Sequence, residues 1–83
     1  QPITAIGRDV RNDIVIEDTA LSALHARIMS EDGSFFIVDQ NSTNGVFIFD
    51  TRTNRWEKQD SYELHDGTEI KIGRTILHFK RSN

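Results

Sequence analysis

The sequence predicts an all-β domain built as an antiparallel β-sandwich or barrel. Apolar side chains recur with a period of two rather than about 3.6, in runs rich in β-branched and aromatic residues. Asp-Gly, Asn-Gly and Gly-Arg pairs, which are turn signals, separate these runs at short intervals. No stretch has the periodicity of an amphipathic helix. Several short strands with regular turns are typical of sandwiches and barrels.

The first half of the chain contains three predicted strands. Ile14–Ile16 is a short β-branched run. Asp32-Gly33 predicts a tight hairpin between the alternating segment Arg27–Glu31 and the segment Phe35–Asp39. The apolar run Ser34–Val38 has apolar side chains on both faces, which favours a central strand.

The second half contains three further strands. In Val46–Phe49 every residue is apolar and β-branched residues alternate with phenylalanines. Ile70–Gly73 and Ile76–Lys80 predict a second hairpin around Gly73-Arg74. Asp50–Trp56 is a polar connection, which we interpret as a hairpin tip, and Trp56 is expected to be a packing residue rather than a ligand platform.

The length of 83 residues predicts one domain, residues 1–83, which we expect to be excised from a longer protein because it starts at Gln1-Pro2 without a methionine. The absence of cysteine excludes disulfides and thiolate metal sites and fits a reducing, cytoplasmic compartment. No apolar stretch approaches the roughly 20 residues of a membrane span, so no direct membrane binding is expected. A net charge of -3 argues against a nucleic-acid binder.

Three short polar patches stand out against the apolar runs. They are Gly7-Arg8, then Ser22–His25, then Asn41–Gly45. Each combines residues that bind ligands from loops: a cation, hydroxyls, amides and glycines that free the backbone. One arginine with several neutral donors suits an anion with many acceptor oxygens, such as a phosphate.

The order and spacing of these patches resemble the forkhead-associated domain family. Ser22 follows Arg8 by 14 residues, and a Ser-Thr-Asn-Gly loop begins 17 residues after His25. The segments Asn12–Ile16 and Leu64–Gly73 also resemble family strands. The resemblance, from about residue 6 to 79, implies a β-sandwich of about eleven short strands, with the first shortened to residues 3–6. It also implies that loops at one end bind phosphothreonine in partner proteins.

The resemblance also implies a role for each residue of the patches. Arg8 forks onto two phosphate oxygens. Ser22 meets the phosphate through its hydroxyl and backbone amide, and Thr43 adds a phosphate or peptide contact. The side-chain amide of Asn44 bonds the peptide backbone, since it both donates and accepts. The expected structural supports of the site are Gly7, His25, Asn41, Ser42 and Gly45.

Ala23 departs from the family pattern. Relatives often carry arginine or asparagine there, whereas Ala23 offers only a backbone N–H. Losing one charge-assisted hydrogen bond costs about 1.5–3 kcal/mol. Arg11, in the neighbouring loop, is a candidate to compensate.

Two other classes of function remain open from the residues. A scaffold or self-association domain, independent of phosphate, would use a sheet face carrying Phe47, Phe49 and Trp56. An enzyme would use Ser22 and His25 with Asp18 or Asp39 as a triad. No nucleophile-elbow sequence is present, and we expect no catalytic residues, no metal and no other cofactor. The oligomeric state and the peptide preference stay undetermined.

Overall fold

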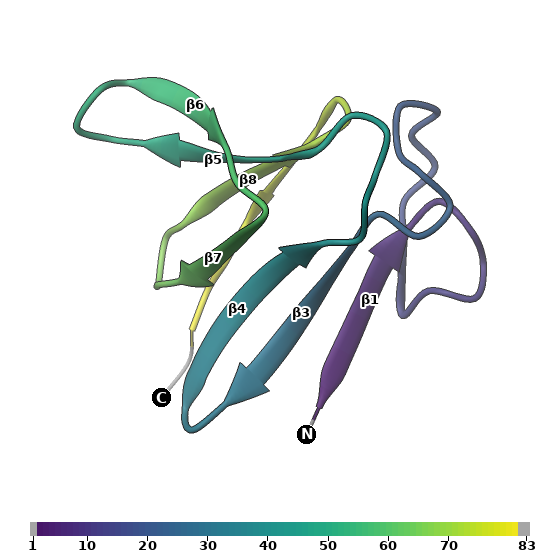
Figure 1. Cartoon of the computed structure of the whole chain (residues 1–83), viewed down its shortest axis with the longest axis horizontal. Helices are drawn as coiled ribbons and strands as arrows, with labels where there is room; N and C mark the ends of the chain where they lie inside the picture. Colours follow the sequence, from purple (N-terminus) through teal and green to yellow (C-terminus); the bar gives the residue numbers. More distant parts are fainter. Residues whose placement is uncertain (1, 82–83) are drawn as a thin grey trace.

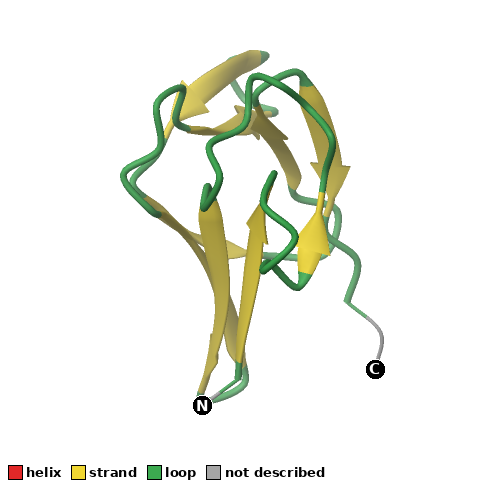
Figure 2. Cartoon of the chain, turned by 90° about the vertical axis from the view of Figure 1, so that its right-hand side faces the viewer, coloured by secondary structure: helices red, strands yellow, loops and turns green. Residues whose placement is uncertain are grey.

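The structure, a computed structural model, describes residues 2–81 and confirms the all-β prediction. The described residues form nine strands in two sheets that face each other (Figure 1, Figure 2), where the resemblance implied about eleven strands. The first strand begins at Ile3, close to the expected shortened start. Over this part of the chain there is no helix long and apolar enough to cross a membrane.

One sheet has five strands. Their order across the sheet is β2 (Ile14–Val15), β1 (Ile3–Gly7), β3 (Ala26–Glu31), β4 (Ser34–Asp39) and β7 (Ser61–Leu64). All its pairs are antiparallel except β1 with β2, which is parallel. As predicted for Ser34–Val38, β4 is an interior strand, since β3 and β7 flank it.

The other sheet has four strands, all antiparallel. Their order is β6 (Arg55–Lys58), β5 (Val46–Asp50), β8 (Glu69–Ile72) and β9 (Thr75–His78). The predicted hairpin around Gly73-Arg74 is β8–β9, and the polar connection is the tip of the β5–β6 hairpin. Trp56 packs edge-on against Phe49 with ring centroids 5.2 Å apart, which confirms its packing role.

The predicted tight turn at Asp32-Gly33 joins β3 to β4. Glu31 pairs with Ser34 across it. Asp32 and Gly33 both have positive φ, 53° and 81°. Two consecutive positive φ values give the turn the twist that matches an antiparallel hairpin, and Asp-Gly is among the pairs that adopt them most readily.

Two strands differ from the sequence prediction. The segment Asn12–Ile16 forms only a two-residue strand, Ile14–Val15, because Asn12 turns inward to bond the neighbouring loops. Strand β7 was not predicted: only Leu64 is buried in it, and a single buried residue is too weak a pattern to indicate a strand.

The core lies between the two sheets. Its buried side chains are mostly β-branched, in keeping with strands that pack through one face: Ile6, Leu21, Ala26, Ile37, Val46, Ile48, Leu64, Ile70 and Ile72. Leu21 lies outside the strands, in the loop between β2 and β3, and is only 2% exposed. Its burial anchors that loop to the end of the sandwich.

Candidate anion pocket at the loop end of the sandwich

Three loops meet at one end of the sandwich: the loop after β1, the loop between β2 and β3, and the loop between β4 and β5 (Figure 1). Together they line a pocket of about 320 Å³. The lining residues come from all three polar patches or lie beside them: Arg8, Thr19, Ala20, Leu21, Ser22, Ala23, Thr43 and Asn44. None is acidic and one is an arginine, so the pocket suits an anion.

Arg8 brings the positive charge to this pocket. It directly follows β1, and its Nε–H donates to the carbonyl of Leu21 at 3.2 Å. Because Leu21 is buried, this bond fixes the plane of the guanidinium against a rigid part of the loop. The two terminal amino groups of Arg8 have no hydrogen-bond partner among the described residues, so they are free to fork onto an anion.

The hydroxyls of Ser22 and Thr43 face each other across the pocket. Ser22 Oγ accepts the backbone N–H of Thr43 at 2.9 Å, and the two hydroxyl oxygens lie 3.5 Å apart. The hydroxyl contact is at the long limit of a hydrogen bond. Both O–H groups can therefore turn toward an incoming acceptor at little cost.

His25 joins the second and third loops from beneath. It is fully buried. Its Nδ1 accepts the backbone N–H of Ser22 at 3.0 Å, and its Nε2 lies 2.8 Å from the carbonyl oxygen of Gly45. This pair of partners assigns a neutral ring protonated at Nε2, since Nδ1 faces a donor and Nε2 an acceptor. The expectation that the Ser22 backbone N–H meets the phosphate is therefore not met, because this N–H bonds His25, and only the Ser22 hydroxyl is left for a ligand.

Asn44 ties the third loop to the second. Its Nδ2 donates to the carbonyl of Ala20 at 2.8 Å. Its Oδ1 has no donor among residues 2–81 and remains able to accept a backbone N–H from a ligand.

Side-chain hydrogen bonds shape the third loop internally. Ser42 Oγ donates to Asp39 Oδ1 at 2.6 Å and accepts the Gly45 N–H at 3.0 Å. Asn41 and Gly45 have φ of 55° and 85°, the left-handed region that these two residue types tolerate best. The loop is thus held in one shape before any ligand arrives.

Gly7 lets the first two loops approach closely. A Cβ on Gly7 would lie 2.2 Å from the carbonyl oxygen of Ala23 and 2.8 Å from Asn12 Nδ2. Asn12 was not among the predicted site residues, yet its Nδ2 donates both to Asp9 O at 2.8 Å and to Ala23 O at 2.7 Å. The sequence signal was weak: a single asparagine just before an apolar run.

Asp18 was considered from the sequence only as a possible triad carboxylate, and its structural role was not predicted. Its carboxylate accepts the backbone N–H of Ala20 at 2.9 Å and the Thr75 hydroxyl at 2.8 Å. It also accepts the backbone N–H of Arg74 at 2.8 Å. These bonds, led by the one from Ala20, lower the pKa of Asp18 below its usual value. Asp18 thereby fastens the pocket loop to the β8–β9 turn.

Ala23 and Arg11 differ in their relation to the pocket. Ala23 lines it, and its backbone N–H has no acceptor within the described part of the chain. Arg11 does not line it: its guanidinium bonds both carboxylate oxygens of Asp9, at 2.9 and 3.1 Å. That pair lowers the pKa of Asp9. The structure therefore does not bring Arg11 to the pocket as a substitute for the missing side chain at position 23.

Two other hollows of similar size, about 320 and 340 Å³, lie between the β5–β6 hairpin and β7. Their linings include the carboxylates of Asp50, Glu57, Asp66 and Glu69 and a single cation, Arg52. This excess of negative charge disfavours an anion. Charge thus distinguishes the pocket beside Arg8 from these hollows.

Fold and pocket together define a small β-sandwich whose loops carry a pocket lined by one arginine and no carboxylate. The model of the FHA domain family matches residues 4–73. The chain therefore belongs to the FHA (forkhead-associated) domain family.

Two curated relatives and one solved structure illustrate the similarity. The chain is 39% identical over 79 residues to the glycogen accumulation regulator GarA of Mycolicibacterium smegmatis, which covers 95% of this chain and 46% of GarA. It is 38% identical over 79 residues to the oxoglutarate dehydrogenase inhibitor of Corynebacterium diphtheriae, which covers 95% and 51%. The chain thus spans about half the length of these relatives.

The solved structure is EmbR of Mycobacterium tuberculosis in complex with a low-affinity phosphopeptide. It superposes with a TM-score of 0.81 at 31% identity, covering 94% of this chain and 19% of EmbR.

Proposed function

We propose that this domain is a phosphothreonine-dependent protein-interaction module that holds a phosphopeptide in the pocket beside Arg8. The observation that carries the proposal is the free end of the Arg8 guanidinium, fixed by Leu21 in a pocket that no carboxylate lines. A phosphate carries nearly two negative charges and several acceptor oxygens, which match these donors.

Each donor in the pocket has a role in this proposal. The terminal amino groups of Arg8 fork onto two phosphate oxygens. The remaining lone pairs of the phosphate oxygens accept hydrogen bonds from the Ser22 and Thr43 hydroxyls and from the free Ala23 N–H. Asn44 Oδ1 accepts a backbone N–H of the peptide beside the phosphorylated residue. His25, Gly7, Asn41, Ser42 and Gly45 hold the loops and do not touch the ligand.

The known proteins support this function. EmbR, a relative in fold and sequence, has been solved with a phosphopeptide. The GarA and oxoglutarate dehydrogenase inhibitor relatives are, by name, a regulator and an inhibitor, as expected of proteins that act by binding others. We extend this mode of action to the present domain, which in our proposal has no catalytic residues and no cofactor. It acts in the cytoplasm, where kinases phosphorylate its partners, as one part of a longer protein.

Ala23 sets the expected strength of binding. An arginine there would add a charged donor, and the alanine contributes only its N–H. The missing bond amounts to about 1.5–3 kcal/mol, or roughly tenfold to a hundredfold in affinity. We therefore expect weaker binding than in a relative with arginine at this position.

The preference for threonine over serine comes from the γ-methyl group. Burying one methyl contributes only about 0.8 kcal/mol. A much larger preference requires that the methyl also order the peptide in the pocket. The third loop, with Thr43 and Asn44, is the wall placed to contact it.

Titration with three matched peptide libraries tests the proposal. The fixed central residue is phosphothreonine, phosphoserine or threonine, and the flanking positions are randomised. We expect binding in that order, with the unmodified library at background, and loss of binding in Arg8→Ala. Arg11→Ala is the matched control, because it removes the same charge from outside the pocket.

Equal binding of the phosphothreonine and threonine libraries, or unchanged binding by Arg8→Ala, would overturn the proposal. A partner that binds Arg8→Ala normally would instead favour the alternative function, a phosphate-independent scaffold that uses a sheet face.

A further inference from the structure

The outer face of the four-stranded sheet carries a row of side chains that the pocket does not use. Lys58 on β6 and Lys71 on β8 both pair with Phe47 on β5, one from each side. Lys71 also pairs with Ile76 on β9. Phe47 points away from the core because its neighbours Val46 and Ile48 are buried. The row Lys58–Phe47–Lys71–Ile76 therefore runs across the whole sheet on its solvent side.

This row is basic and partly apolar. No carboxylate lies within 4.0 Å of either lysine ammonium in the described part of the chain. Ile76 is 49% exposed, and Phe47 is half-buried. The Lys71 ammonium lies 5.9 Å from the centre of the Trp56 ring, so its charge is presented over an aromatic surface.

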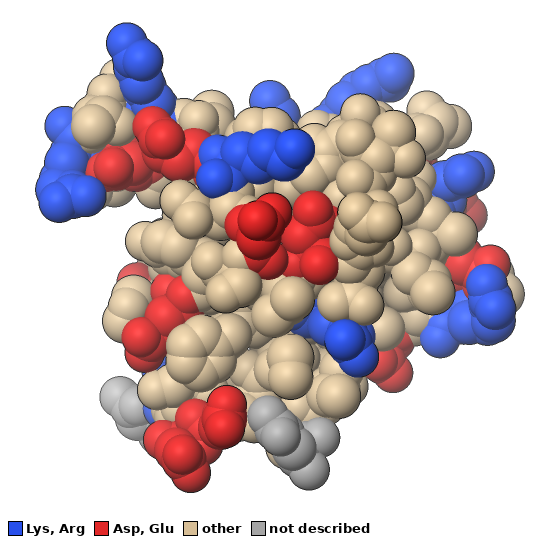
Figure 3. Space-filling model, viewed as in Figure 1, with Lys and Arg blue, Asp and Glu red and all other residues tan. Residues whose placement is uncertain are grey.

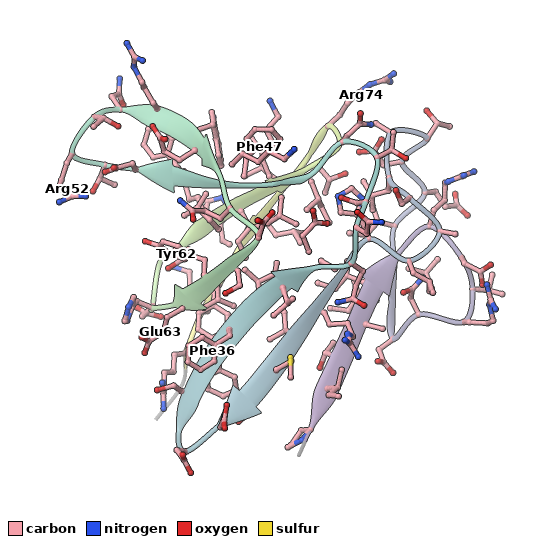
Figure 4. All side chains as sticks on the ribbon, in the orientation of Figure 1. Phe36, Phe47, Arg52, Tyr62, Glu63 and Arg74 are labelled. Carbon is pink, nitrogen blue, oxygen red and sulfur yellow. The ribbon has the colours of Figure 1, made fainter. Side chains whose placement is uncertain are left out.

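The row begins next to the third loop of the pocket. The Lys58 stem lies over Gly45: a Cβ built there would be 2.8 Å from Lys58 Cε. Figure 3 shows Lys and Arg side chains along the upper edge of the molecule. Figure 4 shows Phe47 and Arg74 on this same edge, with Arg74 at the end near the loops. One end of the row thus lies next to the third loop of the pocket.

We propose that this row is a second docking surface for an acidic segment of the same partner that carries the phosphothreonine. The inference rests on the proposed function, since the phosphate brings the segment beside the row. Two lysines without carboxylate partners complement aspartates or glutamates, and Phe47 and Ile76 offer apolar area between and beside the charges. Such a tethered second contact raises affinity without any change in the pocket.

The same row explains why a domain with net charge -3 still attracts an acidic partner. Many of its acidic side chains lie off the row, for example around the hollows lined by Asp50, Glu57 and Asp66. Glu69 shares the outer face of β8 with Lys71, and its carboxylate lies 3.8 Å from His78 Nδ1 on β9. The charged side chains of the row itself are both lysines, and the pocket carries Arg8. Local charge steers an approaching partner more than net charge does, within a Debye length of about 8–10 Å.

Pairs of phosphothreonine peptides test the inference. Each pair shares a core selected from the library, and one member adds a run of aspartates, placed before the phosphothreonine in one pair and after it in another. The double variant Lys58→Gln/Lys71→Gln removes both charges of the row and keeps a polar side chain, one atom shorter than lysine, at each position. Arg52→Gln/Lys80→Gln is the matched control, because it removes two charges at exposed sites off the row.

We expect one placement of the aspartates to tighten binding by roughly three- to tenfold, the gain of two exposed ion pairs. The gain should vanish in Lys58→Gln/Lys71→Gln, persist in the control variant and fall with added salt. Neither variant should change the affinity of the core peptide. An equal gain in all three proteins, or no gain in the parent protein, would overturn the inference. The proposed function fails separately, if the core peptide does not require its phosphate.

Discussion

The Nε2 atom of His25 lies 2.8 Å from the carbonyl oxygen of Gly45, twenty residues away in the chain. This bond, with the one from the Ser22 N–H to Nδ1, holds the second and third loops together beneath the pocket. A single buried side chain therefore sets the spacing between Ser22 and Thr43, whose hydroxyls face the ligand in our account.

His25→Ala should destabilise the fold and weaken phosphopeptide binding together. It leaves the Ser22 N–H and the Gly45 carbonyl without a partner, at about 1–3 kcal/mol each. Chemical denaturation should show a lower midpoint, and titration should show a weaker complex. Leu24→Ala, at an exposed neighbouring site, is the control and should change stability by less than about 0.5 kcal/mol. A His25→Ala protein as stable as its parent would contradict this role.

Gly7→Ala should separate the first loop from the second. The new Cβ meets a backbone carbonyl at 2.2 Å, which has no rotamer to move out of the way. We expect a loss of about 1–3 kcal/mol in unfolding free energy, typical of overpacking, and weaker peptide binding, because Arg8 shifts with the loop. Gly33→Asn is the comparison, since nothing lies within 4 Å of that glycine and asparagine tolerates positive φ. Equal stability of the two variants would refute the close-approach argument.

Ala23→Arg should tighten phosphopeptide binding by roughly tenfold to a hundredfold, the worth of one charge-assisted bond. Position 23 is exposed and lines the pocket, so a long side chain reaches the phosphate without disturbing the core. The gain should be absent for the unmodified threonine peptide. Calorimetric titration of both peptides measures it, and a gain that is equal for the two would point to unspecific charge instead.

Asp18 should make stability depend on pH in a defined direction. Its pKa is lowered in the folded state, chiefly by the Ala20 N–H. Its contribution is therefore fully present above the unfolded value of about 3.9 and is lost as the pH falls through the folded pKa. Asp18→Asn should be less stable than the parent at pH 7. The difference in unfolding free energy between the two proteins should become smaller as the pH is lowered. Thermal unfolding of both proteins across this range checks it, and a constant gap would exclude the carboxylate as its source.

Local patterns in the sequence predicted much of the fold and the choice of pocket loops. Asp32 and Gly33 both have positive φ, which aspartate-glycine pairs adopt readily. The position of the hairpin could therefore be predicted from these two residues alone. Arg8, Ser22, Thr43 and Asn44 do line one pocket, as their order suggested. Their roles toward a ligand remain part of the proposal.

Long-range partners were beyond the reach of the sequence. In the sequence, Asn12 resembles an ordinary strand residue. In the fold, its Nδ2 lies 2.7 Å from the carbonyl oxygen of Ala23, eleven positions later. Asp18 bonds Thr75 across 57 positions. The pairing of Arg11 with Asp9 is a contact between residues only two positions apart, and it was missed because Arg11 was assigned to the phosphate instead. Strand β7 forms because β4 offers it an edge, not because its own residues alternate clearly.

A chemical-shift map of the domain with a phosphothreonine peptide tests the central claim most directly. Our account predicts that the largest amide shifts cluster at Arg8, Ser22, Ala23 and Asn44, and that the unphosphorylated peptide produces none of them. Shifts of equal size with both peptides, or shifts that leave these residues unmoved, would contradict it.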